Sequence, residues 1–180
     1  MLSVRGLYDH DLKPGEGVVL VEAILMSVQQ NMITVGSIDP AALQRAKETV
    51  EQLRWLYIRE WAPEALNEME AAVLALQQYS GASELVESRR AAVLQRSHDM
   101  KGQAGTFGLD LLADFAASIH AVISASLQIG TRDGDVCLGH IMAMRTALRA
   151  VAVEPDGVLN PSLEKHLRRD LRKIIRKTFN

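Results

Sequence analysis

Apolar residues recur at intervals of three and four along successive segments of this chain, and short runs of turn-forming residues separate the segments. This spacing is typical of amphipathic α-helices, each of which buries one stripe of side chains. Alanine and leucine are abundant, and aromatic residues make up only 4% of the chain, so local preferences also favour helix over strand. Neither an alternating strand pattern nor a repeat of fixed period recurs. The sequence predicts an all-α protein.

Capping residues, prolines and glycines divide this pattern into separate helices. Asp39-Pro40 and Asn160-Pro161 each place a capping side chain before a proline suited to the first helical position. At Ala62-Pro63 we expect a break, because the residue before a proline disfavours helical geometry. Residues 1–17 show no period and are expected to form an irregular arm. The expected helices cover residues 16–32, 39–60, 63–79, 84–103, 109–126, 134–153 and 161–177, with turns at 80–83, 105–108 and 130–133.

Antiparallel helices joined by short turns predict an up-and-down four-helix bundle over residues 62–153. Residues 1–61 would add an N-terminal arm and accessory helices, and residues 160–178 a basic amphipathic helix. Three aromatic residues cluster near the end of the N-terminal part: Trp55, Tyr57 and Trp61. We interpret them as packing that docks the N-terminal helices rather than as a ligand site.

The composition argues against several classes of protein. The formal net charge of −2 argues against nucleic acid as the main partner. A single cysteine, Cys137, rules out an internal disulfide framework or a zinc site with several thiolates, and we expect it in the core. The longest apolar run, Val18 to Met26, contains Glu22 and is too short to span a bilayer. No signal-like segment opens the sequence, so we expect a soluble cytoplasmic protein without a transmembrane segment.

The stretch from Ser97 to Gly108, SHDMKGQAGTFG, departs from the surrounding helical pattern. It holds three glycines within seven residues, although glycine inside a helix costs about 1 kcal/mol relative to alanine. His98 and Lys101 lie three residues apart and therefore on one helical face. Small residues on that face would let the backbone of a partner protein come close. The expected neighbours of His98 on this docking face are Ala91, Leu94, Gln95, Lys101, Gly102 and Gly105, whereas the expected core positions are Met100, Ala104 and Phe107.

Other chemistries fit this stretch less well. A metal site would need further ligands, and neither a histidine nor a carboxylate stands four positions after His98. A hydrolase would need a nucleophile with a base and oxyanion donors. The sequence has no Gly-x-x-x-x-Gly-Lys-Ser/Thr loop for nucleotide phosphates. Lys101, in contrast, would place a positive charge about one turn from the imidazole, where the oxygens of a phosphoryl group on His98 would lie.

From His98 to Gly108 the chain resembles the signature of histidine phosphotransfer (HPt) domains, His-x-Leu-Lys-Gly followed by small residues and a later glycine. Met100 stands where leucine is usual, and the resemblance covers roughly residues 62–153. It implies a phosphorelay carrier in which His98 is the phosphoacceptor and Lys101 offsets the phosphoryl charge. The implied partners are receiver domains of a hybrid histidine kinase or a response regulator.

The resemblance also implies that the carrier has no nucleotide site or cofactor of its own, and that the receiver domain supplies Mg²⁺. The alternative is a non-catalytic helical module that binds or sequesters a receiver domain without accepting a phosphoryl group. The sequence does not identify the kinase, the regulator or the oligomeric state.

A second histidine follows from hairpin geometry. His98 and His120 are equidistant from position 109, beside the turn at Gly108, and such residues lie level in an antiparallel pair. His120 could hydrogen-bond Nδ1 of His98 and fix its tautomer, with plain packing as an equal alternative. In many relatives the equivalent position is Glu or Gln. Because this chain has His120 there, we expect phosphotransfer to slow as falling pH protonates the His120 imidazole. The other histidines have no local constellation and are interpreted as structural or solvated: His10, His140 and His166.

Charge is unevenly distributed along the chain. Residues 161–180 contain seven Lys or Arg against Glu164 and Asp170, a balance of +5, which leaves −7 on residues 1–160. Apolar residues lie on one side of this basic segment: Leu163, Leu167, Leu171, Ile174 and Ile175. The helix could dock on the acidic bundle, or it could contact an anionic membrane or an acidic receiver surface. The sequence leaves both readings open.

Overall fold

The computed structural model describes residues 39–78, 83–126 and 128–179, and within these ranges the chain forms helices and connections without a strand. The chain divides into two compact units, Met1–Arg54 and Trp55–Asn180. The expected irregular arm and the expected helix over residues 16–32 lie outside the described residues. For the described part, the prediction of an all-α protein is confirmed.

The first unit contributes most of α2 (Pro40–Leu56) to the described residues. Asp39 caps this helix as expected, because its Oδ1 accepts a hydrogen bond from the Ala41 amide at 3.0 Å. Side chains one turn apart then pair along the exposed surface, as Gln44 Nε2 and Glu48 Oε1 do at 2.9 Å. The start of α2 therefore follows directly from its sequence.

The second unit begins with a π-helical turn, η2 (Tyr57–Trp61), which leads directly into α3 (Ala62–Gln78). The expected break at Ala62-Pro63 is wrong. Ala62 keeps helical torsion angles, φ −66° and ψ −43°, and its amide donates to the carbonyl of Tyr57, five residues earlier. In a regular α-helix the ring of Pro63 would meet the carbonyl of Arg59. The wider turn accommodates the ring, so the backbone remains helical.

The π-helical turn carries aromatic side chains into the core of this unit. Tyr57 is fully buried, with its ring centroid 5.3 Å from that of Phe107 and its hydroxyl 3.5 Å from the Met100 carbonyl oxygen. Burial raises the pKa of the Tyr57 hydroxyl well above its usual range. Trp61 is buried as well, and Arg59 lies over the Trp55 ring. Tyr57 and Trp61 are thus packing residues.

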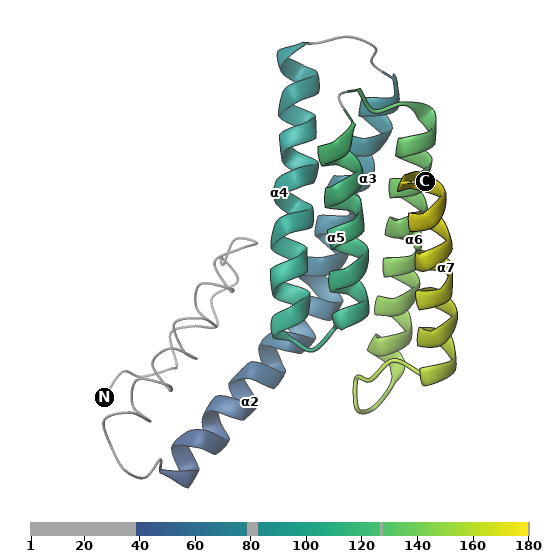
Figure 1. Ribbon diagram of the computed structural model, residues 1–180. Helices are drawn as coiled ribbons and strands as arrows, with labels where there is room; N and C mark the ends of the chain where they lie inside the picture. Colours follow the sequence, from purple (N-terminus) through teal and green to yellow (C-terminus); the bar gives the residue numbers. More distant parts are fainter. Residues whose placement is uncertain (1–38, 79–82, 127, 180) are drawn as a thin grey trace. The chain divides into compact units, whose positions relative to one another are not determined.

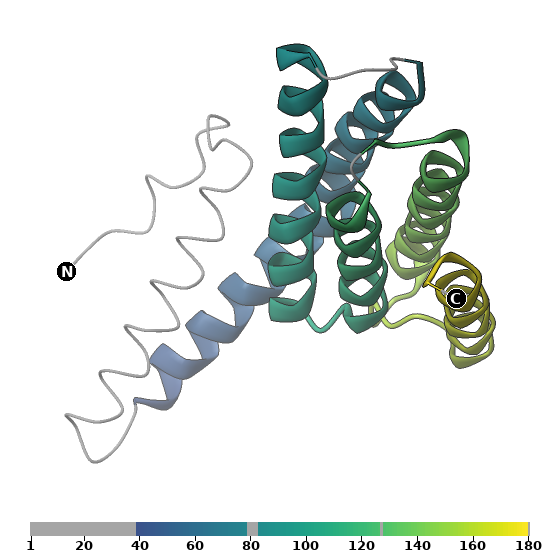
Figure 2. The same ribbon diagram turned by 45° about the horizontal axis from the view of Figure 1, so that its top comes forward.

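The core of the second unit is an antiparallel four-helix bundle, made by α3, α4 (Glu84–Thr106), α5 (Asp110–Ala125) and α6 (Thr131–Val153) (Figures 1 and 2). α4 and α6 each pack on both α3 and α5, which closes the ring of helices. The predicted four-helix bundle is confirmed. Its largest fully buried side chains include Leu66, Met69, Met100, Leu112, Phe115, Ile119, Ile123, Ile141 and Met144.

The turn between α4 and α5 is shorter than predicted. α4 continues through Thr106, so the turn expected at 105–108 comprises residues 107–109. Gly108 adopts φ +68°, a left-handed conformation that favours glycine. The amide of Leu109 then donates to the Ala104 carbonyl at 2.8 Å, which closes the end of α4. Gly108 is therefore the structural turn residue that the sequence predicts.

α6 also begins earlier than predicted, at Thr131 rather than after residue 133. Gln77 of α3 holds this first turn, because its Nε2 donates to the Thr131 carbonyl and to Asp135 Oδ1, both at 3.0 Å. Gly134 leaves room for that side chain, since a Cβ there would lie 2.4 Å from it. This start depends on a neighbouring helix and cannot be recognised in the local sequence.

α6 is the only one of the described helices that is long and apolar enough, by length and composition, to cross a membrane. In the bundle it is a core helix, with Cys137, Ile141 and Met144 fully buried. The expected core position of Cys137 is confirmed. Burial, with a contribution from Asp133, raises the pKa of its thiol to about 12.

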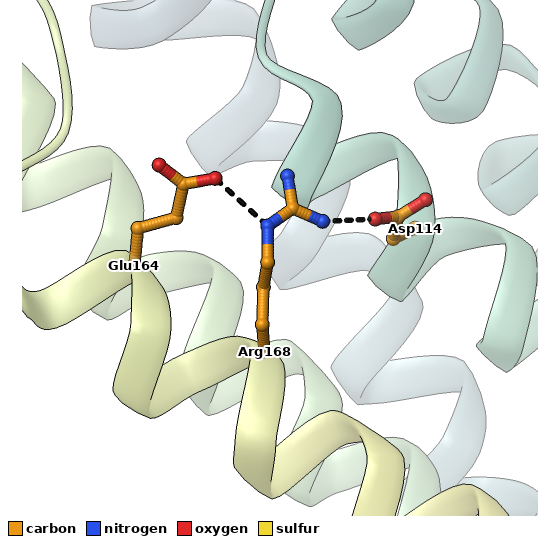
Figure 3. Close-up of polar contacts among 3 residues, drawn as sticks. All are labelled: Asp114, Glu164 and Arg168. Carbon is orange, nitrogen blue, oxygen red and sulfur yellow. Dashed lines mark hydrogen bonds and ion pairs between the residues drawn. The ribbon is translucent and has the colours of Figure 1, made fainter. Parts of the chain in front are cut away.

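α7 (Pro161–Phe179) packs on α5 and α6 and buries Leu171. Asn160 caps its start, accepting from the Ser162 amide at 2.9 Å. Arg168 donates from Nη1 to Asp114 Oδ2 of α5 at 2.6 Å and from Nε to Glu164 Oε1 at 2.8 Å (Figure 3). Docking on the bundle, one of the two readings of this segment, is therefore what the structure shows.

Candidate functional site

α4 presents His98 to solvent because its other side is used for packing. Ser83 caps the helix, its Oγ accepting from the Val86 amide at 3.2 Å. A buried stripe then follows the helix through Val93, Ser97, Met100 and Ala104. Phe107 continues the buried side in the turn, so all three predicted core positions are confirmed. His98 lies next to this stripe but points outward and is exposed.

The residues expected around His98 form an open surface on the same side of α4. Lys101 is exposed, and so are four of the small or polar neighbours: Ala91, Gln95, Gly102 and Gly105. Leu94, expected to be exposed, is half-buried. Gln95 donates from Nε2 to Asp99 Oδ1 at 2.7 Å, which orients one side of this surface.

The two glycines beside His98 are not required by contacts within the described chain. A Cβ added at Gly102 or Gly105 would meet no atom within 4 Å. Neither residue has a positive φ, so the backbone does not demand glycine either. Glycine at either position makes the helix less stable than alanine would, and no contact within the described chain compensates for that loss. What they provide is clearance above the helix next to His98.

His120 of α5 lies opposite His98, as the hairpin geometry predicts. The centroids of the two imidazole rings are 6.3 Å apart, and the ring planes are inclined by 53°. Among the described hydrogen bonds, none joins the two rings directly. His120 is half-buried, and its Nδ1 lies 3.3 Å from Ser124 Oγ, one turn further along α5. This contact uses Nδ1 of His120, so its Nε2 remains available for another hydrogen bond.

Arg90, which lies outside the motif around His98, links α4 to the end of α5. Its guanidinium donates to the carbonyl of Ser126 and, at 3.3 Å, to that of Ser124. A cation suits this position, because the last carbonyls of a helix lack partners and carry partial negative charge. Arg90 and Ser126 are equidistant from Gly108, so the same hairpin geometry that pairs the two histidines identifies this contact.

His140 is a buried polar residue whose partners belong to the core. Its Nδ1 lies 2.7 Å from the Val136 carbonyl oxygen and its Nε2 2.9 Å from Ser118 Oγ. The ring packs edge-on against Phe115, with centroids 5.4 Å apart. Burial lowers the pKa of His140 below its usual value, opposed in part by the backbone hydrogen bond. His140 is structural, whereas His166 is exposed on α7 and His10 lies outside the described residues.

The arrangement favours chemistry at one exposed imidazole rather than at a metal. Within the described ranges, no group of three or more His, Cys, Asp or Glu side chains could hold a metal ion. The His98 site instead combines an accessible ring nitrogen, a nearby ammonium group and a surface cleared by two glycines. Such a site can form and release a covalent bond to phosphorus when a partner supplies the rest of the reaction centre.

Comparison with known proteins agrees with this geometry. The family model described as "Hpt domain" matches residues 55–154, which include all of α3 to α6 and the site around His98. Neither the curated proteins nor the solved structures give a significant match.

Proposed function

Because this chain belongs to the Hpt domain family, and so to the proteins of phosphorelay signalling, we propose that it is a phosphoryl carrier. His98 accepts a phosphoryl group from a receiver-domain aspartate, such as that of a hybrid histidine kinase, and passes it to a response regulator in the cytoplasm. The observation that carries this proposal is the exposure of His98 beside Lys101 and the open positions at Gly102 and Gly105.

The transfer step follows from the chemistry of an imidazole facing an acyl phosphate. Neutral His98 attacks phosphorus in line with the bond to the aspartate oxygen, through the lone pair on Nε2. The N–P bond forms as the P–O bond breaks, and the aspartate leaves as a carboxylate with the bonding electron pair. Lys101 offsets negative charge on the phosphoryl oxygens. The receiver domain contributes Mg²⁺, so this chain needs no cofactor of its own.

The receiver would dock on the face of α4 that carries His98. Ala91, Gln95, Gly102 and Gly105 are exposed there, and Leu94 offers a half-buried apolar contact. With no Cβ at either glycine, the partner's backbone can reach the level of the imidazole. This matters because in-line attack requires the phosphorus to approach the ring nitrogen to about 3–3.5 Å before the bond forms.

We assign His120 the role of holding the tautomer of His98. Attack through Nε2 requires the proton of neutral His98 to sit on Nδ1, and an acceptor for that proton favours this form. Neutral His120 can be that acceptor through Nε2, while its Nδ1–H donates to Ser124 Oγ. A direct N–H···N bond of ~2.9 Å would bring the ring centroids to roughly 5 Å. The exposed side chain of His98 can close this difference by rotating.

Incubation with a phosphorylated receiver domain tests the proposal. We expect acid-labile, base-stable label on the wild-type chain and none on His98→Ala. The matched control is His166→Ala, which removes an exposed histidine of α7 and should label like the wild type. Label that persists in His98→Ala would contradict the assignment of the phosphoacceptor. A wild type that binds receivers but never acquires label would instead identify a non-catalytic binding module.

A further inference from the structure

α7 exposes a straight row of positive charges that the proposed phosphotransfer does not use. Four cationic side chains follow one another at intervals of four, three and four residues, and all are exposed: Lys165, Arg169, Arg172 and Arg176. We call them the cationic row. Over eleven residues of helix the row is about 16 Å long. Like charges at this spacing destabilise a helix, so the row is not explained by the stability of α7 itself.

The docking of α7 determines which way the row faces. Leu171 is buried against the bundle, and Arg168 is tied to Asp114 of α5 and to Glu164 (Figure 3). At 100° per residue, Leu167 and Leu171 lie roughly opposite the centre of the row. The apolar side of α7 therefore contacts the bundle through Leu171, whereas Ile175 is 37% exposed, and the cationic row points away from the bundle.

Little of the row's charge is neutralised within the described residues. Asp170 Oδ1 lies 3.4 Å from Arg169 Nε and 4.0 Å from Lys173 Nζ, but all three side chains are more than half exposed. Exposed pairs of this kind are weak and screened by solvent. Glu164 pairs with Arg168 on another side of the helix. The row thus keeps a net positive potential.

We propose that the cationic row is a binding surface for an anionic phospholipid membrane, to which the folded protein adsorbs through α7. The row is straight and lies on one convex helix, so it fits a flat surface better than a pocket or a narrow groove. Rows of Lys and Arg on an amphipathic helix attract anionic headgroups without reading a specific sequence or shape. Leu171 stays packed on the bundle, so the attachment is electrostatic and does not require α7 to insert.

The charge of the remaining chain favours one orientation at such a surface. Residues 1–160 carry a net charge of −7, whereas residues 161–180 carry +5. An anionic membrane therefore repels most of the chain and attracts α7. Val153 at the end of α6 and Val158 in the connection that leads into α7 are also exposed and add apolar surface before the start of α7. Nucleic acid is a weaker candidate, because the sequence between Lys165 and Arg176 contains no Phe, Tyr, Trp, Asn or Gln that could stack on bases or read their edges.

Adsorption through α7 would leave the phosphoacceptor free. α7 packs on α5 and α6, while His98 lies on α4. Both views of the molecule place α4 and α7 on opposite sides of the bundle (Figures 1 and 2). A membrane-bound carrier could thus still receive its partner at His98. Membrane binding does not depend on the proposed phosphotransfer, so the two can be tested separately.

Vesicle sedimentation with the full chain tests this surface. We expect the protein to bind vesicles of phosphatidylglycerol but not of phosphatidylcholine, and to be released as the salt concentration rises from ~50 to ~500 mM. Each cation removed should weaken binding about fivefold. A variant with four substitutions should then bind at least a hundredfold more weakly: Lys165→Gln, Arg169→Gln, Arg172→Gln and Arg176→Gln.

The matched control removes four exposed cations elsewhere and changes the net charge equally: Arg45→Gln, Lys47→Gln, Arg59→Gln and Arg149→Gln. It should bind phosphatidylglycerol vesicles nearly as well as the wild type, and circular dichroism verifies the fold of both variants. Equal loss in the two variants would show a net-charge effect and overturn the proposal. So would binding of duplex DNA or polyglutamate at salt concentrations where the vesicles are not bound.

Discussion

The chemistry proposed for His98 depends on side chains within one helical turn or one neighbouring helix. Lys101 is exposed one turn further along α4, and His120 faces His98 from α5 at 6.3 Å between ring centroids. A phosphoryl group adds nearly two negative charges at neutral pH. Lys101 can offset that charge, whereas neutral His120 can accept a hydrogen bond from Nδ1–H of His98 and so keep the proton on that nitrogen. In the proposed mechanism the two residues therefore act on different parts of the same reaction.

Replacing Lys101 should slow phosphoryl transfer without unfolding the protein. We expect Lys101→Ala to lower the rate of label acquisition by roughly 10- to 100-fold, because an electrostatic contact to the developing phosphoryl charge is lost. Since the side chain is exposed, thermal stability should stay unchanged. Rapid-quench labelling by a phosphorylated receiver measures the rate, with Arg149→Ala as the control. A rate equal to that of the wild type would contradict the role of Lys101.

His120 should make transfer sensitive to pH. When His120 is protonated it can only donate, so it no longer accepts a hydrogen bond from Nδ1–H of His98, and wild-type transfer slows as the pH falls. His120→Gln keeps an amide that accepts a hydrogen bond but does not titrate. We expect the ratio of wild-type to variant rates to fall as the pH is lowered. A ratio that stays constant would show that His120 only packs against its neighbours.

His140 should couple the stability of the bundle to pH. Burial lowers its pKa in the folded state, so the unfolded chain binds the proton more readily. The bundle keeps its full stability at pH values above the pKa of histidine in the unfolded chain, about 6.5. It loses stability as the pH falls below that value, towards the lower pKa of His140 in the folded state. Urea unfolding at several pH values should show this loss in the wild type. In His140→Gln, which should be less stable overall, the loss between pH ~7.5 and ~5.5 should be smaller.

At the scale of the element, α4 gives up stability at the face where the receiver is proposed to dock. Gly102 and Gly105 are helical and exposed, and among the described residues no atom of another element lies within 4 Å of an added Cβ, so alanine fits both positions. We expect each glycine-to-alanine change to raise the free energy of unfolding by about 0.5–1 kcal/mol. The same change should weaken receiver binding and slow labelling, because a methyl group then stands where the partner approaches. A pair of variants that gain stability and keep full transfer would contradict docking at these glycines.

The elements also show what the sequence can and cannot predict. Helix spacing correctly predicts the bundle and the core positions of Met100 and Ala104, and equal distance from the turn brings His98 opposite His120. These features are local or depend on one hairpin. The π-helical turn before Pro63 escapes prediction, because one extra residue in a turn hardly changes the spacing of apolar residues.

Contacts between elements distant in sequence are the other class that the sequence leaves undetermined. The hydrogen bond of His140 with Ser118 follows from how α5 and α6 pack, and the ion pair of Arg168 with Asp114 from where α7 docks. Neither pair has a characteristic spacing along the chain. Arg90 is the instructive exception, because its contact with the end of α5 obeys the hairpin geometry that pairs the two histidines.

At the scale of the whole second unit, Trp55–Asn180, the bundle separates two surfaces. One is the face of α4 around His98, and the other is α7 on the opposite side (Figures 1 and 2). The family match ends at residue 154, before α7 begins. The bundle alone therefore contains the proposed phosphotransfer site, and α7 is an addition that packs on α5 and α6.

Loosening α7 should consequently leave the bundle and its reactivity intact. Arg168 links α7 to α5 through Asp114, but its side chain is about a third exposed and that of Asp114 about half. We expect Arg168→Ala to cost no more than about 1 kcal/mol of unfolding free energy, because partly exposed ion pairs are screened. Hydrogen exchange should accelerate in α7 while the amides of α3 to α6 stay protected. Labelling of His98 should proceed at the wild-type rate, since no residue of α7 belongs to that site; slower labelling would show that α7 supports the phosphoacceptor through the bundle.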